Sequence, residues 1–228
     1  MREKRRIAGF ETWVLGPGSE RAHPTLILLH GRGADGSDLA ALHPYLHFPG
    51  RLLCPDAPMP FVAGGTGRAW YDDATRRQDL ERAVKEMLRF LKAVAEEYPT
   101  TDRPILGGFS QGGVVTYEVG LRYPEGFAGL IMMSAFMAPD HPCREAAPAP
   151  EKVPPILLTH GSEDPLITVD RAHEASAWLG AAGIAHEYVE DAAGHSLSPG
   201  HLEAINTFLR RCFLPESEGG SGAEDEIS

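Results

Sequence analysis

One serine stands in the surroundings that a hydrolytic nucleophile needs. Ser110 is the centre of Gly108-Phe109-Ser110-Gln111-Gly112, a G-x-S-x-G sequence that directly follows an apolar run and directly precedes a helical period. Glycines on both sides permit a turn too tight for neighbouring side chains, and such a turn exposes the serine oxygen at the start of a helix. The alternative is a Gly-rich turn whose serine only caps that helix. The apolar run before the motif and Gly113 after it favour the nucleophile.

A serine hydroxyl is a weak nucleophile, so it needs a base, and the base needs an acid that orients it. Around a turn of this kind the expected order along the chain is serine, acid, histidine. Asp164 lies in His160-Gly161-Ser162-Glu163-Asp164-Pro165, just past an apolar run, and His195 lies in Ala193-Gly194-His195-Ser196. We therefore predict acyl transfer by Ser110, Asp164 and His195.

Other residues compete for these roles. Glu163 is the main alternative for the acid and Asp140 a more distant one, while Asp164 could instead stabilise a surface turn. The chain has ten histidines, and His195 could be a simple loop residue. His30 and His160 end apolar runs, so we expect them to organise loops. The remaining competitors, which we place on helix or strand faces, are His173, His186 and His201.

The tetrahedral intermediate of acyl transfer needs backbone N–H donors for its oxyanion. One donor should be the amide of Gln111, the residue after the nucleophile. We assign the other to the amide of Arg32, because Gly31 and Gly33 let the backbone turn inward there; a plain strand-to-helix turn is the alternative. This stretch lacks both the third glycine of a dinucleotide fingerprint and the Gly-Lys-Ser/Thr of a P-loop, so we predict no nucleotide site.

Apolar side chains in the loops that follow strands are candidates to line an acyl pocket, although plain loop packing is as common for such residues. The residues that we predict to bind substrate are Trp70, Tyr71, Phe136 and Leu166, and Phe61, Met137 and Leu197 lie in similar places.

These residues must be held by an alternation of strands and helices. Short apolar runs typical of strands buried on both faces cover 25–30, 51–55, 104–109, 129–134, 155–160 and 186–190, and helical periods cover 77–98, 111–123, 169–182 and 199–212. This order predicts an α/β fold, a mostly parallel sheet with helices on both faces. Phe10 to Leu15 is a candidate antiparallel edge strand. The long connections 56–76 and 137–154 are too short for a cap domain, so we expect an open site.

Length and composition limit the domain organisation, the partners and the cellular location that we expect. We expect one domain over 1–214 of the 228 residues, followed by an acidic tail over 215–228 whose composition predicts disorder. The net charge of -11 disfavours nucleic acid as a partner. Three cysteines without CxxC spacing favour a reducing cytoplasm, and no apolar run is long enough for stable membrane insertion. We predict no metal and no cofactor, and leave the oligomeric state open, with a homodimer as the alternative to a monomer.

Together the motifs resemble the phospholipase/carboxylesterase family of α/β-hydrolases, which includes the acyl-protein thioesterases. The resemblance runs from about Thr25 to Phe213 and is carried by 29–33 (LHGRG), 55–58 (PDAP), 69–72 (AWYD), 107–113 (GGFSQGG), 160–165 (HGSEDP) and Gly194-His195. It implies an α/β-hydrolase fold, catalytic Ser110, Asp164 and His195, oxyanion amides at Arg32 and Gln111, and no cofactor.

Two departures from the family pattern concern the substrate. Members often carry leucine where Arg32 stands, and Ala34 separates Gly33 from Asp35, where many members have the acid directly after the glycine. The cation of Arg32 could favour an acidic acyl or leaving group, or it could extend into solvent. We predict cleavage of small or medium acyl esters. Lysophospholipase or acyl-protein thioesterase activity is the alternative within the enzymes, and a non-catalytic hydrolase-fold binding module is the alternative of another class.

Overall fold

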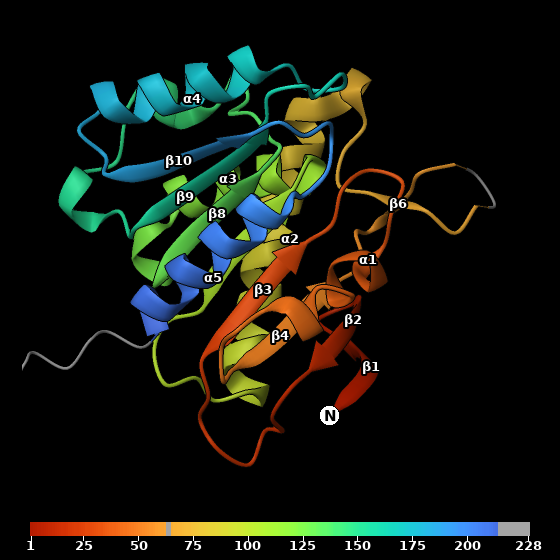
Figure 1. Ribbon diagram of the computed structural model, residues 1–228. Coiled ribbons are helices and arrows are strands. Elements are labelled where there is room, and N and C mark those ends of the chain that lie inside the picture. The colour runs from red at the N-terminus through yellow and green to blue at the C-terminus, as the bar shows by residue number, and fades with distance from the viewer. Residues whose placement is uncertain (63–64, 214–228) are drawn as a thin grey trace, which may run out of the picture.

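The computed structural model describes residues 1–62 and 65–213 (Figure 1). Its main sheet has eight strands in the order β1-β2-β4-β3-β7-β8-β9-β10. The strands are β1 (Arg2–Ile7), β2 (Phe10–Leu15), β3 (Thr25–Leu29), β4 (Arg51–Pro55), β7 (Ile105–Phe109), β8 (Gly129–Met133), β9 (Ile156–Gly161) and β10 (His186–Asp191). The predicted tail, 215–228, lies outside the described residues.

The sheet is mostly parallel, as predicted. The six strands from β4 to β10 pair in parallel, whereas β2 is antiparallel to both of its neighbours, β1 and β4. The prediction that Phe10 to Leu15 forms the edge was therefore wrong, because β1 pairs with its outer side. Only Ile7 of β1 is buried, and charged side chains are typical of an edge strand because they oppose pairing with another chain.

Alternate residues of the central strands enter the two hydrophobic cores, one on each face of the sheet. In β3, Leu26 and Leu28 pack on one side while Ile27 and Leu29 pack on the other. Helices α1 (Gly36–Ala40) and α5 (Pro199–Phe213) cover the first face, and α2 (Arg76–Glu97), α3 (Gln111–Arg122) and α4 (Val169–Ala181) cover the second (Figure 1). The sheet is thus buried between two layers of helices.

A network of charges joins α2 to α3. Glu118 of α3 has a fully buried side chain, and its carboxylate accepts hydrogen bonds from both terminal nitrogens of Arg77 at 3.0 and 2.9 Å. Glu81 of α2 pairs in turn with Arg77 and with Arg122, at 2.9 and 3.0 Å. A buried carboxylate is stable only when it is paired and hydrogen-bonded, so this network fixes the position of the helix that follows Ser110.

The connections after the strands hold short elements. The 56–76 connection contains the two-stranded sheet β5 (Met59–Pro60) and β6 (Arg68–Ala69), and single turns of 3₁₀ helix cover His43–Tyr45, Asp73–Thr75, Pro124–Gly126, Pro142–Arg144 and Pro150–Lys152. Within the described ranges, none of the helices combines the length and apolarity that crossing a bilayer requires.

Candidate active site

Ser110 occupies a strained turn between β7 and α3. Its backbone lies at φ 54° and ψ −120°, a conformation that non-glycine residues adopt rarely and that is typical of functional sites. A side chain at position 108 would overlap the backbone of Gly112, and one at position 112 would overlap the Leu29 carbonyl oxygen on β3. The glycines of the motif therefore allow the turn to pack directly against the neighbouring strand.

The structure brings the three predicted side chains together. His195 Nε2 lies 2.9 Å from Ser110 Oγ, and His195 Nδ1 lies 2.6 Å from Asp164 Oδ2. An ionised carboxylate only accepts hydrogen bonds, so Nδ1 carries the imidazole proton and Nε2 is free to accept the hydroxyl proton of Ser110. Phe109 packs its ring 4.9 Å from the imidazole centroid.

Asp164 is fixed on both of its oxygens. Its Oδ1 accepts hydrogen bonds from the Leu166 and Ile167 amides, both at 2.9 Å, while Oδ2 faces His195. Burial alone would raise the pKa of this carboxyl, but hydrogen bonds from the Ile167 amide, His195 and the Leu166 amide outweigh burial, so the pKa lies below its ordinary value. Asp164 is accordingly ionised at neutral pH.

The two competitors for the acid lie elsewhere. Glu163 has an exposed side chain, and Asp140 lies 3.6 Å from Arg76 in an ion pair. His30 and His160 organise loops, as predicted. The Ala57 amide donates to His30 Nε2 at 2.9 Å, and His160 Nε2 donates to the Ile167 carbonyl at 2.8 Å, beside the Asp164 loop.

Arg32 and Gln111, whose amides are predicted to bind the oxyanion, both line the cavity that Ser110 borders. Within residues 1–62 and 65–213, neither N–H donates a hydrogen bond to a protein acceptor. The loop that carries Arg32 is held by β6, since Gly33 donates to the Arg68 carbonyl and Arg68 donates to the Ala34 carbonyl, both at 2.8 Å. Backbone N–H groups without a protein acceptor are the donors that an oxyanion site requires.

The side chain of Gln111 has a separate positioning role. Its Oε1 accepts from the Trp70 amide at 3.0 Å and its Nε2 donates to the Tyr71 carbonyl at 2.8 Å. Both bonds are buried, so they attach the 70–72 segment firmly to the nucleophile turn. Sequence reasoning assigned only the backbone of Gln111, because nothing in the pattern indicates the partner of its side chain.

The predicted substrate-binding residues divide into two groups. Tyr71 and Leu166 line the cavity of about 430 Å³ in front of Ser110. Trp70 is 1% exposed and its indole N–H donates to the His30 carbonyl at 2.8 Å, so the expectation that it lines the pocket was wrong. Phe136 likewise does not border this cavity, since its ring packs under Arg171, whose guanidinium lies 4.8 Å from the ring centroid.

A second hollow of about 260 Å³ adjoins the first, and the two share Asp38, Phe109 and His195. Its remaining lining is Leu39 of α1, Leu42 just after that helix, and Ser196 and Leu197 from the loop before α5. We define the two hollows together as the cleft. Sequence reasoning missed Asp38, Leu39 and Leu42, because α1 and the turn that follows it are too short to show a helical period.

The side chain of Arg32 makes a contact that the sequence did not indicate. Its Nη1 lies 2.6 Å from Asp73 Oδ2, and its guanidinium lies 5.2 Å from the centroid of the Phe61 ring. All three side chains line the first hollow. The cation therefore forms an ion pair within the protein, with its side chain 42% exposed.

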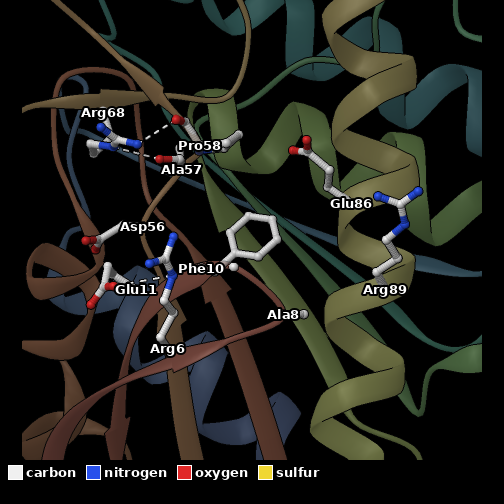
Figure 2. Close-up of a pocket in the computed structure, with 11 residues that line it drawn as sticks. Arg6, Ala8, Phe10, Glu11, Asp56, Ala57, Pro58, Arg68, Glu86 and Arg89 are labelled. Carbon is white, nitrogen blue, oxygen red and sulfur yellow. Dashed lines mark hydrogen bonds and ion pairs between the residues drawn. The ribbon is translucent and has the colours of Figure 1, made fainter.

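A separate hollow of about 460 Å³ is lined by residues of β1, β2 and α2 together with Asp56, Ala57, Pro58 and Arg68 (Figure 2). Arg68 donates to the Ala57 and Pro58 carbonyls, while Glu86 and Arg89 extend from α2 (Figure 2). Ser110 does not border this hollow. Among the described residues, no three His, Cys, Asp or Glu side chains lie close enough together to hold a metal ion.

Comparison with known proteins decides the family. A model of the phospholipase/carboxylesterase family matches residues 12–213. The chain belongs to the phospholipase/carboxylesterase family. Acyl-protein thioesterase 1 of Emericella nidulans is 26% identical over 90% of this chain and 96% of its own length, and carboxylesterase SOBER1 of Arabidopsis thaliana is 26% identical over 70% of this chain and 75% of its own.

Solved structures agree with this assignment. The crystal structure of esterase PE8 has a TM-score of 0.78 and 27% sequence identity, and covers 89% of this chain and 99% of its own. A carboxylesterase from Mesorhizobium loti has a TM-score of 0.76 at 20% identity, over 91% of this chain and 98% of its own, which shows the fold alone. The fold is that of the α/β-hydrolases, as predicted, and membership in a phospholipase/carboxylesterase family favours an enzyme over a non-catalytic binding module.

Proposed function

We propose that this member of the phospholipase/carboxylesterase family is a serine carboxylesterase that cleaves small or medium acyl esters through an acyl-enzyme on Ser110. One observation carries the proposal: an unbroken chain of hydrogen bonds runs from Ser110 Oγ through the His195 ring to Asp164, with distances of 2.9 and 2.6 Å. A neutral imidazole with its free nitrogen toward a serine hydroxyl is the arrangement that general-base activation needs.

The reaction follows from this geometry. His195 Nε2 takes the hydroxyl proton as Ser110 Oγ attacks the ester carbonyl, and Asp164 stabilises the imidazolium that forms. The amides of Arg32 and Gln111 donate to the developing oxyanion. His195 then returns the proton to the departing alcohol, and water hydrolyses the acyl-enzyme by the same steps with His195 again as the base.

The shape of the cleft supports a modest acyl group. The hollow in front of Ser110 has a volume of about 430 Å³ and is bordered by Tyr71 and Leu166, and Leu166 is 74% exposed. Burial raises the pKa of the Tyr71 phenol, so this wall stays uncharged. An open apolar wall binds acyl chains mainly through the area that they cover.

A thioester is the second candidate substrate, because several relatives are named acyl-protein thioesterase 1. The mechanism does not distinguish the two, since His195 can protonate an alcohol or a thiolate. We place the reaction in the cytoplasm, a proposal supported by Cys54, Cys143 and Cys212, all of which are free thiols.

The test is a series of p-nitrophenyl esters from acetate to palmitate, with a thioester measured in parallel. We expect the highest kcat/KM at short or medium chains, and a pre-steady-state burst of p-nitrophenol that matches the enzyme concentration if deacylation is the slow step. Ser110→Ala should remove the burst and turnover together. Turnover that persists in Ser110→Ala would refute the proposal, and a preference for the thioester would select the second candidate.

A further inference from the structure

Three charged side chains besides the predicted triad border the cleft in the described part of the chain. Arg32 and Asp73 line the first hollow, and Asp38 lines both hollows where they meet beside His195. The cleft thus has two carboxylates and one guanidinium. Its charge depends on which of these groups neutralise each other.

Arg32 and Asp73 neutralise each other. Their 2.6 Å contact is the closest approach that either makes to an opposite charge, and Phe61 supports the guanidinium from one side. The two side chains are 42% and 66% exposed, so the pair is screened, but its net charge is zero at any ionic strength. A substrate carboxylate that approached Arg32 would have to displace Asp73.

Asp38 has no such partner. No Lys or Arg nitrogen of the described residues lies within 4.0 Å of its carboxylate, and its side chain is exposed in the first turn of α1. The hollow behind it is lined mainly by apolar residues, Leu39, Leu42, Phe109 and Leu197. An unneutralised negative charge therefore stands at the rim of an apolar hollow, next to the imidazole that protonates the leaving group.

From this arrangement we infer that the cleft selects esters with a positively charged leaving group, such as a quaternary ammonium alcohol, and that Asp38 is the residue that determines this preference. The inference rests on the proposed function. Hydrolysis splits such an ester into the free acid and the cationic alcohol, with one water consumed. The methyl groups of the ammonium contact the apolar lining of the second hollow, while its charge lies near the Asp38 carboxylate.

The size of the preference follows from the exposure of Asp38. An exposed ion pair contributes about 0.2–1 kcal/mol, which corresponds to a factor of about 1.4 to 5 in kcat/KM. The effect must decrease with salt, because the screening length is about 10 Å at 0.1 M and about 3 Å at 1 M.

The experiment compares two butyrate esters of nearly equal shape, the choline ester and its neutral carbon isostere, the 3,3-dimethylbutyl ester, with acid release followed by titration. The choline ester is also chemically more reactive, so the measured quantity is how the ratio of the two kcat/KM values changes among variants. General damage to the enzyme cancels within each ratio, and the chemical difference between the esters cancels when the ratio of a variant is compared with that of the wild type.

Asp38→Asn should lower the ratio about 1.4- to 5-fold at low salt. In about 1 M salt the ratio of the wild type should decrease until it equals the ratio of Asp38→Asn. Arg32→Leu should raise the ratio, because it frees the Asp73 carboxylate while the backbone donor stays. The matched control is Asp170→Asn, which removes an exposed carboxylate in the first turn of α4 that does not line the cleft, and it should leave the ratio at the value of the wild type.

A ratio that is the same in Asp38→Asn and in the wild type at low salt would overturn the inference, and so would a decrease in Arg32→Leu. In either case hydrolysis of the neutral ester by the wild type would still support the proposed function. Failure of the wild type to hydrolyse both esters and the p-nitrophenyl series would overturn the proposed function itself, and the inference with it.

Discussion

Replacement of Asp164 by asparagine should stop turnover without unfolding the protein. The Asp164 Oδ1 atom accepts from the Leu166 and Ile167 amides, so the asparagine oxygen keeps this place and its nitrogen takes the place of Oδ2, 2.6 Å from His195 Nδ1. An amide nitrogen donates, so Nδ1 must become the acceptor and the imidazole proton moves to Nε2. The ring then presents a proton to Ser110 and cannot act as its base.

The same change in a serine protease triad lowers kcat by about 10⁴-fold, which is about 5 kcal/mol of transition-state stabilisation. The loss of stability should be much smaller, because a charge-assisted hydrogen bond is exchanged for a neutral one, a difference on the order of 1 kcal/mol. In a chain of this length that corresponds to a decrease of about 2–4 °C in Tm.

The assay measures kcat on a p-nitrophenyl ester and Tm by circular dichroism for Asp164→Asn and for the matched control Glu163→Gln. Glu163 is the neighbouring exposed carboxylate, and the control should keep kcat within about a factor of two, since an exposed substitution changes free energies by no more than about 0.5 kcal/mol. A folded Asp164→Asn that retains a tenth of the wild-type kcat, or a Glu163→Gln that loses activity instead, would refute the assignment of the acid.

Three further predictions concern stability. The pKa of Asp164 is lower in the folded protein than in the unfolded chain, so its carboxylate stabilises the fold above the unfolded pKa of about 3.9. This contribution is lost as pH falls through the folded pKa. The difference in Tm between the wild type and Asp164→Asn should therefore shrink from pH 6 to pH 3, and a constant difference would contradict the shift. Gly112→Ala should lower the free energy of unfolding by about 1–3 kcal/mol, because the new methyl group overlaps the Leu29 carbonyl. Urea titration measures the free energy of unfolding, and an unchanged value would show that the turn does not pack as described. Glu118→Ala should lower the free energy of unfolding by about 3 kcal/mol. This is the lower end of the range for a broken buried ion pair, because Arg77 is 30% exposed. A loss below about 1 kcal/mol, as for a surface pair, would contradict a structural role for Glu118.

Much of the site could be predicted because the fold restricts it. Ser110 and Asp164 follow the buried strands β7 and β9, and His195 follows the half-exposed edge strand β10. The carboxyl ends of parallel strands meet at one edge of a sheet, so chain order was enough to propose their contact. The glycines beside Ser110 were equally informative, since each is needed where two backbones touch.

The rest depends on contacts between distant segments. Residues 2–7 form a strand although five of the six are polar or charged, since their pairing with β2 supplies what the pattern lacks. Trp70 and Tyr71 are adjacent and both are buried, yet only Tyr71 borders the cavity in front of Ser110, while Trp70 donates its indole N–H to the His30 carbonyl. Arg32 and Asp73 are 41 residues apart, and no local pattern indicates that they pair.

The most direct test of the central claim is to identify the residue that a fluorophosphonate probe modifies. Such probes react with a serine only when a base activates it, so intact-mass analysis should show a single adduct, and peptide mapping should place it on Ser110. Ser110→Ala and Asp164→Asn should show no adduct or a strongly slowed one, while Glu163→Gln should react as the wild type does. An adduct on a different serine, or undiminished labelling of Ser110→Ala, would contradict the account.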